Sequence, residues 1–322
     1  MPSKDWEIPS NLQPDPSDYP FDLERALRGV VGLRANDPGD AFTAGTLGTE
    51  RVGNGVVIRD GLVLTIGYLV TEAETVWLIT ADGRAVPGHP LAFDQTTGFG
   101  LVQALGKLNL PTIEFGDSDA LPVGAEAIVA AGGGRHHAIE TRVVGRQEFA
   151  GYWEYLIDNA IFTSPAHPFW SGSALIGRDG RLLGTGSLIL QQGDGKKRMD
   201  MNMIVPIALL RPVLDELLTT GSAGVVPRPW IGMYAMEGEN GLVVGGLAEH
   251  GPAAAAGVRG GDRILAVGDE EITDLAGLWR KLWASGPAGS TVLLRLGRDT
   301  GNVALRIKSA DRASFLRAPK LH

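Results

Sequence analysis

The stretch HPFWSGSALIGRDGRLLG, residues 167–184, decides the fold. It holds a short apolar run at residues 174–176, the turn signal Arg-Asp-Gly at 178–180, and the start of a second apolar run at 182–190. Two apolar runs joined by such a turn predict a pair of β-strands. Ser171 and its small neighbours precede the pair, so the stretch predicts a serine-bearing turn that leads directly into two strands.

The same pattern of short apolar runs and turn residues extends over most of the chain. Further turn signals stand at residues 59–61 and 81–83, and glycine is abundant, with 45 residues. The apolar runs predict strands at residues 55–58, 62–65, 75–80, 100–104, 125–131, 139–145, 155–161 and 201–205. Many short strands at this spacing indicate a barrel or a sandwich, so the predicted fold class is mainly β.

A change of pattern after residue 205 indicates a second domain. The spacing of the leucines predicts a helix over residues 207–218 that ends near Gly221. Residues 219–229, TTGSAGVVPRP, are rich in Gly and Pro and show no period, which is typical of a linker. We therefore predict five segments: an extended arm at 1–22, a first domain at 23–218, the linker at 219–229, a second domain at 230–310 and a tail at 311–322.

The second domain is predicted to be a small unit of strands with one helix. Strands are expected near residues 231–236, 241–247, 263–267 and 291–296. Leu275, Leu278, Trp279 and Leu282 share one face of a predicted helix over 275–283, which is the usual arrangement of core residues.

Composition excludes several functions. The formal net charge of −8 and the pI near 5.3 argue against a nucleic-acid or anionic membrane partner. The chain has 0 Cys, so it forms no disulfide and has neither a thiolate nucleophile nor a Cys-ligated zinc. No stretch approaches the length of a transmembrane helix. The first 20 residues lack an apolar segment, so a cytoplasmic location is expected, or a periplasmic one if the sequence has lost a leader.

Several motifs, in order along residues 50–210, resemble the HtrA/Deg proteases, which are trypsin-like serine proteases that carry PDZ domains. GNGVVI at 53–58, followed by DGLVLT, resembles the family's opening hairpin, and FGDSD at 115–119 resembles the strand and turn before its second barrel. SGSAL at 171–175, followed by RDGRLLG, resembles its nucleophile turn and the next hairpin. The resemblance implies a trypsin-like double six-stranded β-barrel.

The second domain resembles the family's PDZ domain through GLVV at 241–244, GPA at 251–253 and GGDRILAV at 260–267. Such domains bind peptide C-termini by adding a strand to a sheet edge, and a loop of backbone N–H groups holds the carboxylate. The resemblance places that loop at Trp230, Ile231, Gly232 and Met233, with the helix of Leu278 as the other wall of the groove. A PDZ module that only packs against its neighbour is the alternative.

The resemblance also places the catalytic positions. Ser171 stands at the nucleophile, Tyr68 of TIGYLV stands where the family has its histidine, and Gly98 stands where it has its aspartate. A serine nucleophile needs a base and a group that orients the base. A tyrosine with its ordinary pKa of about 10 is a poor base at neutral pH. Asp94 aligns with an upstream, non-catalytic position and is expected to be a turn residue.

The oxyanion hole is expected to be altered as well. By resemblance its donors are the N–H groups of Phe169 and Ser171, and Phe169 stands where the family has glycine. A side chain at this position disfavours the positive-φ conformations that glycine adopts freely. Phe169 and Trp170 either fill the space of a substrate or belong to the core.

The leading hypothesis is a degenerate HtrA-like protein, a pseudoprotease that binds peptides or protein C-termini through its PDZ domain. It would act in recognition, scaffolding or regulation, within protein quality control. The first alternative is an active serine endopeptidase in which Ser171 uses a non-standard base, for example His167. The second alternative is a metal-binding pseudoprotease that uses His136 and His137; the leading hypothesis includes no metal and no cofactor.

Self-association is the remaining expectation about partners. The resemblance suggests trimers built through aromatic residues near the start of the protease domain, and Trp6, Tyr19 and Phe21 are the candidates. An arm that folds back on its own barrel would use the same residues. Peptides and further copies of the chain are thus the expected partners, with no nucleic acid and no membrane.

Overall fold

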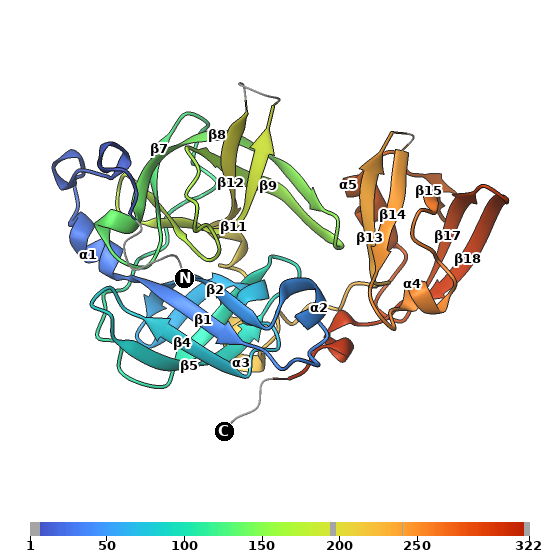
Figure 1. The fold of residues 1–322 in the computed structure, drawn as a ribbon, viewed down its shortest axis with the longest axis horizontal. Helices are drawn as coiled ribbons and strands as arrows, with labels where there is room; N and C mark the ends of the chain where they lie inside the picture. The colour runs from blue at the N-terminus through green and yellow to red at the C-terminus, as the bar shows by residue number, and fades with distance from the viewer. Residues whose placement is uncertain (1–6, 194–197, 240, 319–322) are drawn as a thin grey trace. The chain divides into compact units, whose positions relative to one another are not determined.

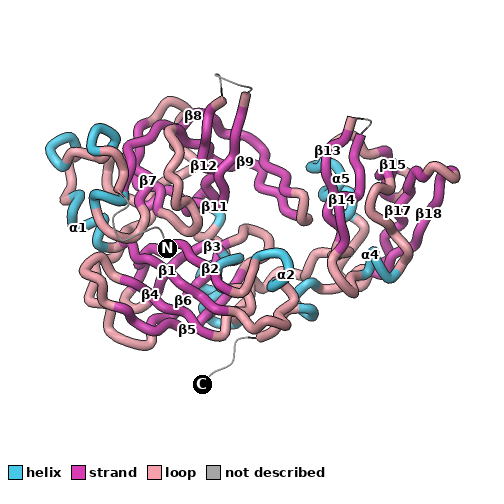
Figure 2. Tube along the Cα trace, in the orientation of Figure 1, coloured by secondary structure: helices cyan, strands magenta, loops and turns pink. Residues whose placement is uncertain are grey.

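The structure is a computed structural model, and it describes residues 7–193, 198–239 and 241–318 of the 322-residue chain. The described residues form two units (Figure 1). The first unit holds the chain up to Gln147, Asn159–Gly224 and the chain from Arg317, and the second holds Glu148–Asp158 and Val225–Leu316. Residues 148–158 fall within the first domain predicted from the sequence, whereas their contacts group them with the second unit. Strands dominate both units (Figure 2).

The first unit begins with a closed six-stranded barrel, in the order β1-β2-β3-β6-β5-β4. Its strands are β1 (Val30–Asn36), β2 (Glu50–Arg59), β3 (Leu62–Ile66), β4 (Thr75–Ile79), β5 (Ala85–Phe93) and β6 (Phe99–Ala104). Every residue of β3 is buried, which matches its unbroken apolar sequence. The strand β5 was not predicted because Pro87 and Pro90 interrupt its pattern.

A second closed six-stranded barrel follows, in the order β10-β11-β12-β9-β8-β7. Its strands are β7 (Glu126–Ala130), β8 (Ala138–Gly151), β9 (Tyr155–Ser164), β10 (Ala174–Gly177), β11 (Leu182–Gln192) and β12 (Met199–Pro206). The two strands predicted from the opening stretch of sequence are β10 and β11, and they pair antiparallel. The two barrels confirm the mainly β, trypsin-like fold class.

The helices of the first unit are short. They are α1 (Leu23–Arg28), α2 (Ala44–Leu47), α3 (Leu214–Thr220) and the 3-10 turns η1 (Ser10–Leu12), η2 (Pro16–Asp18), η3 (Gly67–Leu69), η4 (Arg135–His137) and η6 (Ile207–Leu209). The predicted helix over 207–218 is divided into η6 and α3 because Pro212 lacks an N–H and restricts the residue before it. The predicted end at Gly221 is correct, since Gly221 caps α3 with φ 76°.

The N-terminal arm is not simply extended, because it contains η1 and η2 and packs on the second barrel. Ile8 is 3% exposed and belongs to the core of that barrel. The Tyr19 hydroxyl donates to Glu140 Oε1 at 2.8 Å, and the Arg178 guanidinium lies 5.3 Å from the centre of the Tyr19 ring. Phe21 lies edge-on to Tyr19. Trp6, the third aromatic residue named for self-association, lies outside the described residues.

The second unit is built on a sheet in the order β13-β14-β15-β17-β18, with β16 paired to β15. Its elements are β13 (Met233–Gly238), β14 (Gly241–Leu247), α4 (Pro252–Ala255), β15 (Arg263–Val267), β16 (Glu270–Glu271), α5 (Leu275–Ala284), β17 (Thr291–Arg298), β18 (Gly301–Lys308) and η7 (Arg312–Phe315). The helix α5 matches its predicted range to one residue, and the Asp274 side chain caps it by accepting from Gly277 N at 2.7 Å. Trp279 and Leu282 are fully buried on its inner face.

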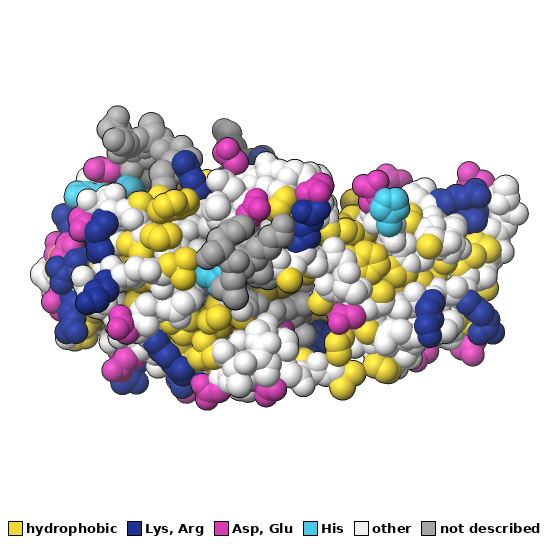
Figure 3. Space-filling view, turned by 90° about the horizontal axis from the view of Figure 1, so that it is seen from below, with side chains coloured by type: hydrophobic (Ala, Val, Ile, Leu, Met, Phe, Trp, Pro, Cys, Tyr) yellow, Lys and Arg dark blue, Asp and Glu magenta, His cyan; other side chains and the backbone are white. Residues whose placement is uncertain are grey.

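The surface carries mixed charges. On the face seen in Figure 3, Lys and Arg side chains lie interspersed with Asp and Glu side chains.

Candidate active site and carboxylate-binding loop

Ser171 sits on a turn between β9 and β10 that Asn54 of β2 fastens to the first barrel. The Asn54 side-chain amide donates to the carbonyl oxygens of Phe169 and Ser171, both at 3.0 Å, and its oxygen accepts from Gly132 N at 2.9 Å. Gly172 follows with φ 73°, and a Cβ there would lie 2.0 Å from Asn54 O. The approach of the turn to β2 therefore requires glycine at 172.

Tyr68, on η3 directly after β3, contacts Ser171. Its phenolic oxygen lies 2.7 Å from Ser171 Oγ and donates to the carbonyl of Ser187 at 2.7 Å. That carbonyl belongs to a register shift in β11 between Gly186 and Leu188. Because the single phenolic hydrogen is used by Ser187, the Ser171 hydroxyl is the donor in its bond to Tyr68. Burial raises the pKa of Tyr68 to about 12, and the hydrogen bonds with Ser171 and Trp170 lower this pKa by a smaller amount.

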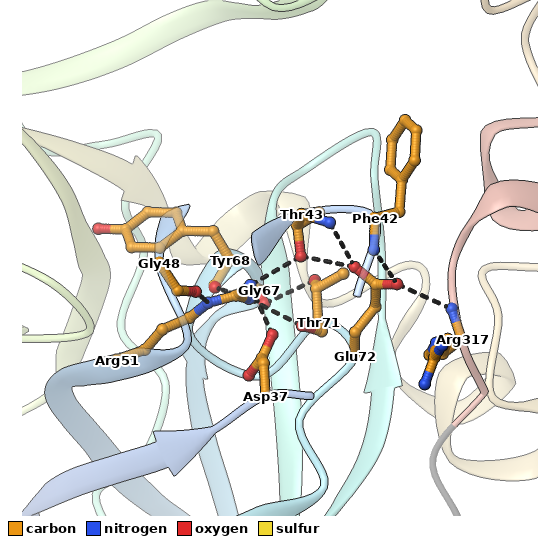
Figure 4. Close-up of polar contacts among 10 residues, drawn as sticks. All are labelled: Asp37, Phe42, Thr43, Gly48, Arg51, Gly67, Tyr68, Thr71, Glu72 and Arg317. Carbon is orange, nitrogen blue, oxygen red and sulfur yellow. Dashed lines mark hydrogen bonds and ion pairs between the residues drawn. The ribbon is translucent and has the colours of Figure 1, made fainter. Parts of the chain in front are cut away.

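A buried guanidinium fixes the turn that carries Tyr68. Arg51 Nη1 donates to the carbonyls of Tyr68 and Thr71, both at 2.7 Å, and Arg51 Nη2 lies 2.5 Å from Asp37 Oδ2 (Figure 4). The side chains of Arg51 and Asp37 are 3% and 0% exposed. Desolvation raises the pKa of Asp37 to about 6, and the nearby Arg51 opposes this shift. In Figure 4 the Tyr68 ring points away from the guanidinium, so Arg51 holds the backbone and leaves the phenol to Ser171.

Glu72 extends this network. Its carboxylate accepts from Phe42 N at 3.0 Å, Thr43 N at 2.8 Å and Arg317 N at 3.0 Å (Figure 4). Thr43 Oγ1 also donates to Glu72 at 2.6 Å and receives Arg51 Nη2 at 2.7 Å. Desolvation would raise the pKa of Glu72, but these donors hold it below its ordinary value. Arg51 and Glu72 thus hold residues 68–72 in place, Arg51 through the carbonyls of Tyr68 and Thr71 and Glu72 through the N–H groups of Thr43 and Arg317.

Gly98 lies beside the Tyr68 turn and offers only backbone to it. Its carbonyl accepts from Gly67 N at 2.7 Å, and its own φ is 83°. The Asp94 carboxylate is used within its own turn, where it accepts from Thr96 N at 3.1 Å and Thr97 N at 3.0 Å. The structure thus brings Ser171, Tyr68 and Gly98 into one region, and Asp94 acts as a turn residue.

His167 is buried and holds the backbone of the Ser171 turn. Its Nδ1 accepts from Phe169 N at 3.0 Å, and its Nε2 lies 3.0 Å from the carbonyl of His137. Since Nδ1 is an acceptor, the proton of the neutral ring is on Nε2 and is donated to His137. Burial lowers the pKa of His167 to about 4. The N–H of Phe169, expected at the oxyanion hole, is directed to this ring, and the ring nitrogens of His167 are engaged with main chain.

The two histidines named as possible metal ligands, His136 and His137, make separate contacts. His137 Nδ1 lies 2.8 Å from the carbonyl of Gly132, and the exposed His136 lies 3.6 Å from Glu7. Within residues 7–193, 198–239 and 241–318, no group of three or more His, Cys, Asp or Glu side chains is placed to hold a metal ion.

The loop from Trp230 to Met233 precedes β13 and is where the carboxylate site was expected. Gly232 has φ 72°, and Ile231 and Met233 are fully buried. Three of its N–H groups converge on one oxygen, Oε1 of Glu154, from Gly232 at 2.8 Å, Met233 at 3.1 Å and Ile231 at 3.3 Å. Leu278, expected on the groove wall, is 0% exposed and belongs to the core of the second unit.

Sequence reasoning missed Glu154. The signal that could have found it is a single acidic residue within GYWEYL, residues 151–156, between two predicted strands. The aromatic residues beside it pack on the second unit, where Tyr152 lies edge-on to Tyr234 with 6.0 Å between ring centres.

Residues 53–184 match the family described as a trypsin-like peptidase domain, and residues 229–308 match the PDZ domain family. The fold and the arrangement around Ser171 therefore define a trypsin-like protease domain joined to a PDZ domain. The chain thus consists of an HtrA/DegP-like, trypsin-like serine protease domain followed by one PDZ domain.

Individual relatives agree with this assignment. A serine protease Do-like HtrA of Lactobacillus helveticus is 25% identical over 295 residues, which cover 82% of this chain and 70% of that protein. A probable periplasmic serine endoprotease DegP-like of Halomonas elongata is 26% identical over 265 residues, or 77% of this chain and 54% of that protein. One of Pseudomonas putida strain W619 is 28% identical over 247 residues, or 71% and 50%. The chain thus spans about half the length of the two DegP-like relatives.

Solved structures show the same fold. An HtrA-type protease AlgW with a decapeptide has a TM-score of 0.53 and 20% identity, over 92% of this chain and 98% of that one. The serine endoprotease from Yersinia pestis has a TM-score of 0.52 and 22% identity, over 95% and 99%. The DegP-like relatives are named periplasmic, so the expected cytoplasmic location gains no support from them. Within the described part of the chain, no helix combines the length and apolarity needed to cross a membrane.

Removing the buried guanidinium should cost much more stability than removing an exposed one. We expect Arg51→Met to lower the free energy of unfolding by about 3–5 kcal/mol, because Asp37 is left as an uncompensated buried charge. The matched control is Arg59→Met, whose partner Asp215 is 91% exposed, with an expected loss below about 1 kcal/mol. Urea denaturation measures both, and equal losses in the two variants would contradict the role given to Arg51.

Acid should destabilise the protein through His167. Its folded pKa of about 4 lies below the ordinary value of 6.5, so the unfolded chain binds the proton more readily. The stability contributed by the neutral ring is therefore complete above pH 6.5 and is lost as the pH falls toward 4. Over that window we expect wild type to lose roughly 3 kcal/mol more than His167→Asn in urea denaturation. Parallel pH profiles of the two proteins would refute this.

Proposed function

We propose that this HtrA-like chain is catalytically impaired at Ser171 and works by binding peptides or protein C-termini through its PDZ domain, in recognition, scaffolding or regulation within protein quality control. One observation carries the proposal: the Ser171 hydroxyl donates to the phenol of Tyr68 at 2.7 Å, and that phenol donates onward to the Ser187 carbonyl.

A phenol in this position does not activate a serine. To attack a carbonyl carbon, Ser171 must pass its proton to its hydrogen-bond acceptor, and a neutral phenol that has already donated its hydrogen is a very weak base. Only the phenolate could accept that proton. With a pKa of about 12, Tyr68 is phenolate in roughly one molecule in 10⁵ at pH 7.

The other two catalytic parts point the same way. Gly98 brings a carbonyl but no carboxylate to the Tyr68 turn, so no group there could orient and stabilise a protonated base. The Phe169 N–H is directed to His167 Nδ1, so it is not available where an oxyanion would develop. Residual catalysis without a triad depends on that hole, which makes even a low Ser171-dependent rate unexpected.

The binding part of the proposal rests on the loop before β13. The convergence of three backbone N–H groups on one carboxylate oxygen is the chemistry that captures the C-terminus of a peptide. The neighbouring strand β13 supplies the backbone groups to which an extended peptide would pair. A carboxylate with an extended segment before it is therefore the class of ligand that this site fits.

Ser171 should behave as an ordinary alcohol. We expect wild type to cleave casein at no higher rate than Ser171→Ala between pH 5 and 9, and to show no Ser171-dependent labelling by a fluorophosphonate, which reports nucleophilic serines without depending on substrate sequence. Trypsin run in parallel controls both assays. Cleavage or labelling that disappears in Ser171→Ala would overturn the proposal in favour of an endopeptidase with a non-standard base.

Self-association is proposed on the family resemblance. Tyr19 and Phe21 are engaged with their own second barrel, so a trimer would have to use other groups of the arm or of the barrel. We expect sedimentation equilibrium at micromolar concentration to give about three times the monomer mass of 34.0 kDa. A mass near that of the monomer would refute trimer formation and leave the arm with an intramolecular role.

A further inference from the structure

Residues 148–158, the reversal between β8 and β9, carry a ligand for the loop that precedes β13. The Glu154 side chain is nearly buried, at 5% exposed, and its Oε1 receives the N–H groups of Ile231, Gly232 and Met233. Ile231 N also lies 3.4 Å from Oε2. A carboxylate that accepts several backbone N–H groups is bound by charge-assisted hydrogen bonds, the strong kind.

The backbone before Glu154 is hydrogen-bonded to β13 and to α5. Ala235 N, on β13, donates to the carbonyl of Tyr152 at 3.0 Å. From the opposite side Trp279 Nε1, on α5, donates to the carbonyl of Gly151 at 2.8 Å. The segment is thus bonded both to the sheet edge and to the helix, the two walls between which an added strand lies.

The conformation of Glu154 explains how a residue inside the chain presents a carboxylate there. Its φ is 59°, in the left-handed region that side-chain-bearing residues rarely adopt and that costs about 1–2 kcal/mol. A left-handed residue reverses the local direction of the chain. The backbone therefore turns toward β9, while the Glu154 side chain extends to the N–H groups of the loop. Its carboxylate takes the place that the terminal carboxylate of a free peptide would occupy.

Further contacts hold the segment in place. Arg280, on α5, pairs with Glu148 and Asp158, one residue at each end of the segment. Ala150 packs against the core of the second unit. Trp153 stacks on Tyr155 with 5.7 Å between ring centres, which stiffens the turn around Glu154.

We propose that Glu154 is a resident ligand of the carboxylate-binding loop, so that a peptide C-terminus reaches Ile231, Gly232 and Met233 only when residues 148–158 leave the groove. The inference rests on the proposed function for the identity of the competing ligand. Because the two ligands use the same N–H groups, occupancy by one excludes the other.

The internal ligand has one advantage and one cost. As part of the same chain it is always present at a high effective concentration, in the millimolar range for short connections. Burial, however, disfavours its charge and raises the pKa of Glu154 to about 7, although the three N–H groups and Arg312 act in the opposite direction. A carboxylate held at such a desolvation cost can be displaced by a peptide that fits the groove without the left-handed turn.

The test compares full-length variants in their affinity for one defined peptide. The probe is fluorescein-labelled Glu-Phe-Ala-Gly-Tyr-Trp-Val with a free C-terminus, which copies residues 148–153 and ends in Val at the place of Glu154. Its amidated twin lacks the terminal carboxylate. Fluorescence anisotropy measures binding to wild type, Glu154→Ala, Glu154→Gln and the control Glu237→Gln, an exposed residue of β13 that loses the same charge. We expect both Glu154 variants to bind the free-carboxylate probe at least about tenfold more tightly than wild type and Glu237→Gln.

A second measurement reports the loop without any peptide. The amides of Ile231, Gly232, Met233 and Ala235 donate to residues 148–158, so hydrogen exchange at these positions should accelerate in Glu154→Ala and stay unchanged in Glu237→Gln. Exchange in β17, which lies away from the groove edge in the strand order, checks that the variant is folded.

The outcomes separate this inference from the proposed function. Tighter binding together with faster loop exchange in the Glu154 variants supports both. Equal affinities in all variants together with unchanged exchange overturn the resident ligand and leave C-terminus binding intact. Faster exchange with no binding of either probe by any variant supports the resident ligand and counts against C-terminus binding as the function. Equal binding of the free and amidated probes would overturn the carboxylate competition itself.

Discussion

The arrangement around Ser171 depends on the side chain of Asn54. This buried amide accepts the N–H of Gly132 and donates to the carbonyls of Phe169 and Ser171, so one side chain of the first barrel satisfies three backbone groups of the second. Any hydrophobic residue of similar size would leave these groups unpaired in the interior. The Ser171 turn therefore keeps its geometry because its backbone groups are hydrogen-bonded to Asn54. That geometry does not depend on whether Ser171 is reactive.

The sequence predicted most of the fold because most strands are short, apolar and bounded by turn residues. It missed β1, Val30–Asn36, and in two other places it failed because a proline opposes the pattern around it. Pro87 and Pro90 concealed β5, whose residues still complete a closed barrel because the neighbouring strands fix its place. Pro212 divided the helix expected over 207–218, although the periodic leucines on both sides are buried as the pattern required.

The candidate site was predictable in its positions and not in its contacts. Motif order placed Tyr68 and Gly98 near Ser171, and the structure brings them together. Tyr68 accepts a hydrogen bond from Ser171, which lies 103 residues away in the sequence. This contact depends on how the two barrels pack together, so no local sequence pattern predicts it. The same holds for His167, whose burial and pairing with Phe169 N turn a possible base into a structural acceptor. Glu154 was missed because its partners lie in another domain of the sequence.

The positive φ of Glu154 has a consequence for what the PDZ loop selects. A loop that binds a carboxylate only through backbone N–H donors does not distinguish a carboxylate at a chain end from one on a residue after which the chain turns away. What distinguishes a chain end from an interior residue is the left-handed kink that the interior residue must adopt. If the loop binds C-termini as proposed, its preference for them amounts to about the cost of one unfavourable backbone conformation. An unbroken polypeptide with an acidic side chain at such a kink then satisfies the loop as well as a terminus does.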